Sequence, residues 1–190
     1  TTLYFIRLAD GARDGLRNIS LKNFHRNRFN DNYSIDSLTQ YYDWNDLVKT
    51  CNTILESEIQ NTDEIWLHLL DTNQVVNPDD HSDHYESALL FSEAMRNKKL
   101  NVLVHEGYSS GKNDRLANLK ETDVIKESGL FAAYNQAMID NGYPSIWNSD
   151  YLRFCDKNYF RVVSDEEHKA PDNQKKVITV FALLVLGTVL

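Results

Sequence analysis

Residues 77–84, in the middle of the chain, have the side-chain types that bind metals and move protons. The segment reads Asn-Pro-Asp-Asp-His-Ser-Asp-His, with three carboxylates and two imidazoles. His81 and His84 are three positions apart, so they share one face of any helix that begins there. A neutral imidazole pair flanked by aspartates suits a divalent metal, with outer carboxylates orienting the rings. A helix start also favours aspartates, at the positive end of its dipole, so both interpretations stay open.

The elements around this segment place it at the end of a buried strand. Residues 63–70 are predicted to form a strand, residues 85–98 a helix and residues 100–105 a second strand. A strand, helix and strand at this spacing favour a βαβ unit with parallel strands. Because open α/β sheets bind ligands beyond the carboxyl ends of their strands, the sequence predicts a site there.

The amino-terminal segment combines a predicted strand with a loop. Residues 3–8 are predicted to be a strand, and residues 9–15 form a loop with two glycines and two aspartates. Arg7 and Asp10, at the end of that strand, are predicted to form either an ion pair or a substrate clamp.

Two longer helices are predicted elsewhere in the chain. The first covers residues 44–59 and the second residues 121–138. The apolar face of the second helix consists of Val124, Ile125, Leu130, Phe131, Tyr134 and Met138.

The other histidines have different expected environments. His68 lies inside a predicted strand and is expected to be a core residue with a backbone partner. His105 ends a strand next to Glu106-Gly-Tyr, which would let it line the same site. His25 and His168 have polar neighbours in the sequence and are expected to face solvent.

Length, charge and cysteine content limit the number of domains, the kind of partner and the kind of metal site that the chain can have. A chain of 190 residues fits one domain with a sizeable core, and 42% hydrophobic residues are typical of a globular protein. Twenty basic and 28 acidic residues give a net charge of -8, which argues against a nucleic-acid partner. Two cysteines, Cys51 and Cys155, cannot build a cysteine-rich zinc site or a disulfide framework. Any metal is therefore expected to be held by histidine and carboxylate.

The two ends of the chain suggest how the protein is organised. The sequence opens without Met or a secretory signal, directly in a predicted strand, so we expect the chain to be part of a longer protein. We expect an α/β domain over residues 1–163 and a polar linker over residues 164–176. Residues 177–190 are apolar and follow two lysines, which predicts either a core element or a truncated membrane span. A cytoplasmic or membrane-associated location is favoured over secretion.

Four blocks of the sequence resemble the PIG-L/LmbE-like family of zinc-dependent N-deacetylases, in the order in which that family has them. Residues 3–15 resemble a strand that ends in an R-L-P-D-G type turn, and residues 79–84 resemble the metal motif H-x-D-H. Residues 106–136 are similar to a block in which G-Y precedes N-L, K and a-Y-x-x-Q. A closing W…R…Y pattern is matched by Trp147, Arg153 and Tyr159. The resemblance covers roughly residues 3–162.

The resemblance implies a fold, a reaction and roles for several residues. The fold would be α/β, with a Rossmann-like, mostly parallel sheet flanked by helices. The reaction would remove acetyl from an N-acetylglucosamine-type substrate by attack of a zinc-activated water on the amide. His84 would be a zinc ligand, His81 would stabilise the oxyanion or shuttle a proton, and Asp83 would orient an imidazole. The residues expected to contact the sugar are Arg7, Asp10 and His105.

One motif of that family, H-P-D-D, is missing from the chain. Residues 77–80 read Asn-Pro-Asp-Asp, with Asn77 where the family has a ligand histidine. Either an amino-terminal segment of the same protein carries the motif, or the chain is a relative that has lost the metal. We favour the first explanation, in which that segment is needed for activity.

The sequence therefore supports three hypotheses about function. The leading one is a zinc-dependent deacetylase of an N-acetylated amino sugar, which would be lipid-linked if residues 177–190 span a membrane. The alternative is a non-catalytic carbohydrate-binding or interaction module that kept the fold without the metal site. A third is a nucleoside-processing hydrolase, based on Glu86 and Glu93 in a helix that precedes a strand.

Overall fold

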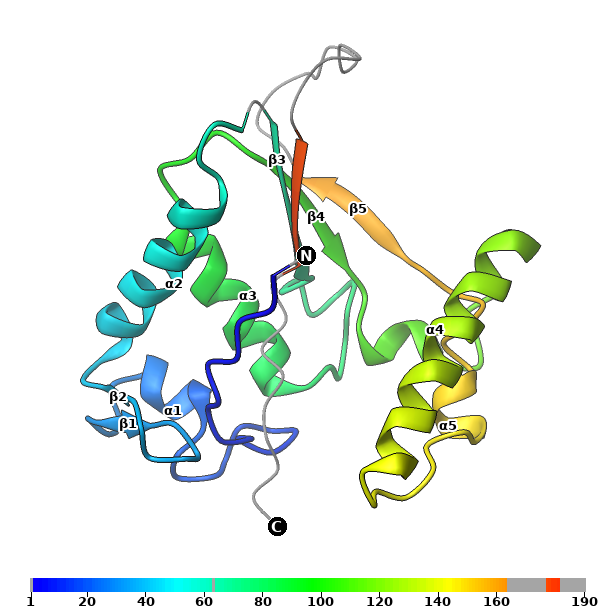
Figure 1. The fold of residues 1–190 in the computed structure, drawn as a ribbon, viewed down its shortest axis with the longest axis horizontal. Coiled ribbons are helices and arrows are strands. Elements are labelled where there is room, and N and C mark those ends of the chain that lie inside the picture. Colours follow the sequence, from blue (N-terminus) through cyan, green and yellow to red (C-terminus); the bar gives the residue numbers. More distant parts are fainter. Residues whose placement is uncertain (1, 63, 164–176, 182–190) are drawn as a thin grey trace.

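The computed structural model describes residues 2–62, 64–163 and 177–181, which form a mixed α/β structure around one four-stranded sheet (Figure 1). The strand order is β5-β4-β3-β6, with β4 and β6 parallel to β3 and β5 antiparallel to β4. The bounds are β3 (Glu64–Leu70), β4 (Asn101–His105), β5 (Phe160–Val163) and β6 (Val177–Phe181). The predicted α/β class, the two central strands and their parallel pairing are confirmed.

The register of the two central strands decides where the site forms. Leu70 and His105, the last residues of β3 and β4, are paired with each other. The segments that leave these two strands therefore start side by side, at the edge of the sheet where α/β proteins bind ligands.

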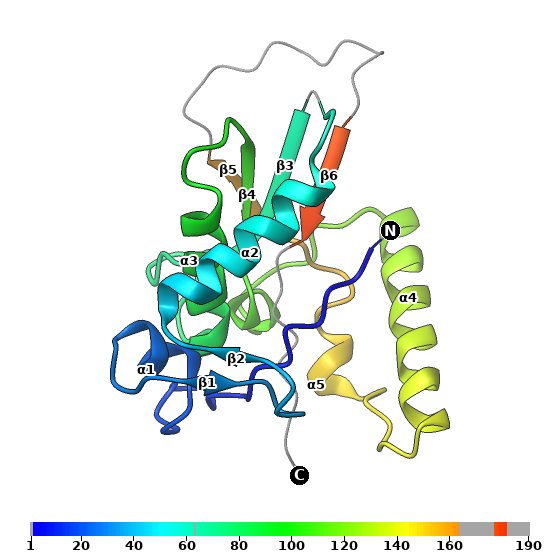
Figure 2. The same ribbon diagram turned by 60° about the vertical axis from the view of Figure 1, so that its left-hand side comes forward.

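Two helices, α2 (Trp44–Glu58) and α3 (Ser82–Ala94), pack against each other beside the sheet, with the short α1 (Leu21–His25) at their end (Figure 2). Asp43 caps α2 by accepting a hydrogen bond from the N–H of Asp46, at 2.8 Å. Helix α3 begins three residues before the predicted start, because the His81 side chain caps it by accepting from the Asp83 N–H.

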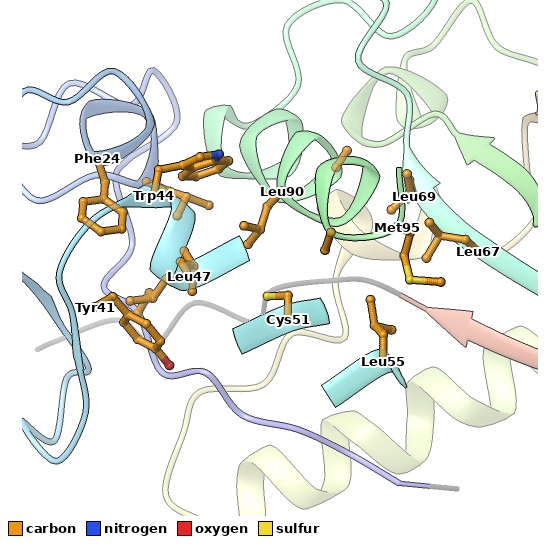
Figure 3. Close-up of a cluster of buried hydrophobic side chains, with 14 of the residues drawn as sticks. Phe24, Tyr41, Trp44, Leu47, Cys51, Leu55, Leu67, Leu69, Leu90 and Met95 are labelled. Carbon is orange, nitrogen blue, oxygen red and sulfur yellow. The ribbon is translucent and has the colours of Figure 1, made fainter. Parts of the chain in front are cut away.

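The hydrophobic core lies between these helices and one face of the sheet (Figure 3). The strand face contributes Leu67 and Leu69, and α3 contributes Leu90, which is fully buried. The other buried apolar side chains labelled in the figure are Phe24, Tyr41, Trp44, Leu47, Cys51, Leu55 and Met95. This packing fixes α3, and therefore its first turn, against the end of β3.

The predicted strand over residues 3–8 is wrong. The segment has no strand over those residues, and Leu3 and Phe5 are 74% and 66% exposed. Residues 3–8 pair with no strand of the described sheet, in which the central strands β3 and β4 have a partner on each side. The segment instead follows the surface past the short hairpin of β1 (Asn32–Tyr33) and β2 (Gln40–Tyr41), where the Ile35 N–H donates to the Arg7 carbonyl.

Helix α4 (Glu121–Asp140) confirms the second long helix, but none of its residues is buried. The apolar face listed for this helix is therefore largely open to solvent, with Ile125 and Leu130 64% and 68% exposed. In Figures 1 and 2 the helix lies with α5 (Ser149–Leu152), away from α2 and α3. Phe131 stacks on Trp147, with ring centroids 5.5 Å apart.

The carboxyl-terminal expectations are only partly within the described residues. Residues 177–181 form β6 and pair with β3, which is what a core strand would do. The predicted linker over residues 164–176, His168 within it, and residues 182–190 lie outside the described residues. Among the helices of the described part, none has both the length and the apolar character needed to span a bilayer.

Arg7 forms an ion pair with Asp36, which precedes β2, so the predicted pair with Asp10 is not formed. Hydrogen bonds from the Ser34 hydroxyl, from Arg7 and from the Leu38 N–H lower the pKa of Asp36 to about 2.

We therefore expect Asp36 to stabilise the fold only while it is ionised. Its pKa is lower in the folded state than the roughly 3.9 of an unfolded aspartate, so the stabilisation is full above about pH 4 and is lost as the pH falls towards 2. Asp36→Asn should lower the urea midpoint at pH 7, and the two midpoints should converge as the pH falls from 4 towards 2. A difference that stays constant over this range would contradict the expectation.

Candidate metal centre

The segments that follow β3 and β4 are joined by one buried amide, that of Asn77. Its Nδ2 donates to the Asp71 carbonyl at 3.0 Å and to Asp80 Oδ2 at 2.8 Å. Its Oδ1 accepts from the Gly107 N–H at 3.0 Å and from the Ser109 hydroxyl at 2.6 Å. All four hydrogen-bonding positions of this fully buried side chain are therefore used. The amide holds the two segments together and fixes Asp80 between them.

The loop of residues 9–15 is the third segment of the site, and it contacts the first turn of α3. The Gly11 N–H donates to Asp83 Oδ2 at 2.8 Å, and the Ser82 N–H donates to the Arg13 carbonyl at 2.8 Å. A Cβ at Gly11 would lie 2.8 Å from Asp83 Oδ1 and 2.5 Å from Ser20 Cβ, so the close approach needs glycine. These contacts bring Asp10 to the start of α3.

Asp10, His81 and Asp83 form a group that could hold a metal ion. One ligand atom from each residue lies within 4.8 Å of the others. His81 Nε2 is 3.9 Å from Asp10 Oδ1, and His81 Nδ1 is 3.6 Å from Asp83 Oδ2. Two carboxylates and an imidazole are a ligand set used for zinc and for several other divalent metals, so the group does not select one of them.

Asp83 is the most buried member of this group, at 1% exposure. Its Oδ1 is buried and has no hydrogen-bond partner. A cation bound at this oxygen would compensate for the missing hydrogen bond. Burial raises the pKa of Asp83, and the hydrogen bond from Gly11 opposes that shift without cancelling it. The site therefore contains a carboxylate oxygen that the described protein groups do not satisfy.

His84 lies beside the group on the third position of α3. Its Nδ1 is 2.8 Å from Asp80 Oδ1, and its ring centroid is 5.4 Å from that of His81 and 5.3 Å from that of Tyr108. Burial raises the pKa of Asp80, but hydrogen bonds from His84, Asn77 and the His81 N–H lower it by more. The net result is a pKa below the ordinary value of an aspartate. The two histidines of the predicted motif are therefore neighbours, as their spacing indicates.

Arg13, Tyr108 and Lys112 also lie beside the site, and the sequence predicts no individual role for them. Arg13 donates to the Asp79 carbonyl at 2.9 Å, and its guanidinium lies 5.9 Å from the centre of the Tyr108 ring. Lys112 lies 3.2 Å from an Asp79 carboxylate oxygen. The clue for Tyr108 was its place after the strand that ends at His105, whereas Arg13 comes from a loop distant in the sequence.

His105 contacts residues on and next to the sheet. Its Nε2 is 2.8 Å from Nδ1 of His68, and its Nδ1 is 3.3 Å from Asn158 Oδ1. Its ring lies 5.7 Å from that of Phe160 on β5. Of the three predicted sugar contacts, Asp10 is therefore in the metal group, His105 is on the adjoining sheet and Arg7 pairs with Asp36.

His25 differs from its expectation of a solvent-facing side chain. Its ring stacks on Trp44, with centroids 4.0 Å apart, and its Nδ1 is 2.6 Å from Glu86 Oε2. Glu93 accepts a hydrogen bond from Trp44 Nε1 at 2.8 Å. The two glutamates behind the nucleoside-hydrolase hypothesis therefore connect α3 to α1 and α2, which is a structural role.

Comparison with known proteins identifies no relative of the chain. No protein-family model, curated protein or solved structure matches it. The resemblance to the PIG-L/LmbE-like family thus stays a prediction from the sequence motifs, and the group of Asp10, His81 and Asp83 is the structural feature on which a function has to be argued.

Proposed function

We propose that the protein is a metal-dependent hydrolase that removes acetyl from an N-acetylglucosamine-type substrate. The observation that carries the proposal is the Asp10, His81 and Asp83 group, with His84 beside it. It lies where the segments leaving two parallel strands meet, and His81 and Asp83 belong to the motif that resembles the deacetylase family. The Rossmann-like form of the sheet and the choice of zinc belong to the same proposal.

The residues present fit a divalent metal, because they offer two carboxylates, an imidazole pair and an unsatisfied buried oxygen. Asp10 and Asp83 would hold it together with one imidazole. The geometry offers His81 for this role, whereas the resemblance assigns it to His84, which is not a member of that group and whose ring lies 5.4 Å from that of His81. When bound, the metal supplies a Lewis acid that polarises a carbonyl and lowers the pKa of water from about 15.7 towards 7.

The protein's own groups would handle the substrate oxygen and the proton. As water adds to the acetyl carbonyl, an imidazole N–H of His81 would donate to the oxygen that gains negative charge. One donor of this kind is worth about 2.7–4 kcal/mol of barrier reduction. The C–N bond then breaks, a proton passes to the amine nitrogen, and the products are acetate and the free amino sugar.

The neighbouring surface suits a sugar ring. Tyr108 is 42% exposed and lies beside His84, with the Arg13 guanidinium near its ring. An aromatic face packs against the apolar side of a sugar, and Arg13 and Asp79 can hydrogen-bond to hydroxyls. Arg7 and His105 stay predictions as sugar contacts.

The test replaces His84 with alanine in the intact protein. Acetate release from an N-acetylglucosamine conjugate should fall by at least about 100-fold, and bound zinc should fall with it. The control is His25→Ala, because His25 contacts Trp44 and Glu86 and none of the metal group. Unchanged zinc content together with unchanged acetate release would reject the proposal.

The same measurements separate the alternative function. A carbohydrate-binding module without catalysis would bind the N-acetylated sugar through the Tyr108 surface and release no acetate. Zinc content at background in the purified intact protein, with sugar binding retained, would favour that module over the hydrolase.

A further inference from the structure

The two neighbouring histidines have different hydrogen bonds at Nδ1. His81 Nδ1 accepts the backbone N–H of Asp83 at 3.2 Å, so this nitrogen carries no hydrogen. His84 Nδ1 faces Asp80 Oδ1 at 2.8 Å, an oxygen that also meets two backbone donors. A neutral imidazole has one N–H, so the hydrogen bonds favour Nε2–H in His81 and Nδ1–H in His84.

Asp80 can act only as an acceptor in this arrangement. Its Oδ1 accepts from the His81 N–H at 2.8 Å and from the Tyr108 N–H at 3.3 Å. Its Oδ2 accepts from Asn77 Nδ2 at 2.8 Å. Both Asp80 oxygens therefore accept from N–H groups that can only donate. In the remaining contact, between Oδ1 and His84 Nδ1, the ring nitrogen has to be the donor.

The carboxylate is also held in place. Asn77 cannot turn its amide around, because its oxygen already accepts from Gly107 and Ser109. Gly107 lies so close that a Cβ there would overlap the Asp80 carboxylate, with 2.6 Å to Cγ. Asp80 is 5% exposed and has no room to rotate away from His84.

We infer that Asp80, fixed by Asn77, is a positioning residue that keeps Nε2 of His84 free of hydrogen and available to a metal. Among the described residues, Nε2 of His84 has no hydrogen-bond partner. Groups that fix the tautomer and orientation of a ligand histidine typically change metal affinity by 10- to 100-fold. The inference rests on the proposed function in taking His84 as the ligand, whereas the tautomer of His84 does not depend on it.

The first measurement uses the unmodified, metal-free intact protein. Long-range ¹H–¹⁵N correlation at about pH 8.5, well above the ordinary imidazole pKa of about 6.5, reports which ring nitrogen carries hydrogen. Loss of one signal set in His81→Gln and in His84→Gln assigns the two rings. We expect Nδ1–H in His84 and Nε2–H in His81, and Nε2–H in His84 would overturn the inference.

The second measurement removes the acceptor. Asp80→Ala should lower zinc affinity by about 10- to 100-fold in competition with a chelator, and His84 should lose its Nδ1–H preference. The matched control is Asp79→Ala, because the Asp79 carboxylate contacts Lys112 and not an imidazole. Equal zinc affinity in both variants would overturn the inference, and the tautomers of the unmodified protein decide it if Asp80→Ala does not fold. If the tautomers are as expected but no acetate is released, the proposed function fails and the positioning by Asp80 stands.

Discussion

Asp10→Asn is expected to remove most of the metal binding of the protein while leaving its fold intact. Asp10 Oδ1 accepts the Ala12 N–H at 2.6 Å, and an asparagine oxygen can accept the same hydrogen bond. The substitution therefore keeps the turn and deletes the negative charge beside His81. Loss of a residue that only orients a metal ligand lowers metal affinity by roughly 10-fold or more. Asp10→Asn should lower zinc affinity by more than about 10-fold, because Asp10 would be a ligand itself.

Asp14→Asn is the matched control for this experiment. Asp14 lies in the same loop, and its Oδ1 accepts the Leu16 N–H at 3.0 Å, which is the same kind of turn. It is not a member of the metal group. Zinc titration followed by calorimetry should therefore show normal affinity for Asp14→Asn and weak affinity for Asp10→Asn. Equal affinities for the two variants would place the cation elsewhere.

The regular elements around the core could be predicted because their signals are local. Helix α2, the central strands and the pairing of β3 with β4 follow from apolar spacing and from strand–helix–strand order. The outcomes that the sequence did not predict depend on partners distant in the chain. Residues 3–8 have strand-like composition but pair with no strand of the described sheet. The apolar face of α4 is covered only in part, because Phe131 stacks on Trp147 while no residue of the helix is buried.

The site was predictable only where its residues are close in sequence. His81, Asp83 and His84 lie within four positions, so helical geometry places them together. Asp10 joins them through a loop whose Gly11 contacts Asp83 across 72 positions, a contact that no spacing rule reveals. The sequence suggested Asp10 as a sugar contact, and the structure brings it together with His81 and Asp83 in a group that could hold a metal ion.

The role of Asp80 could not be deduced from the motif either. In the sequence it is one of three aspartates in residues 77–84, and nothing distinguishes it from Asp79. In the structure Asp79 has a φ of 61° and a carboxylate beside Lys112, whereas Asp80 is buried and bonded to His84. The difference arises from Asn77. Its amide binds the Asp80 carboxylate through Nδ2 and the segment after β4 through Oδ1, which keeps Asp80 buried.

Leu90→Ala is expected to have the largest effect on stability, and through stability on the site. Leu90 is fully buried between α2, α3 and the sheet, on the helix whose first turn carries Asp83 and His84 (Figure 3). Loss of its side chain leaves a cavity and should cost about 3–5 kcal/mol, or about 6–20 °C in Tm for a chain of this size. Leu89→Ala in the same helix is the control, because Leu89 is 39% exposed and should cost about 1 kcal/mol or less. Thermal unfolding followed by circular dichroism compares them, and similar losses in the two variants would mean that α3 does not pack through Leu90.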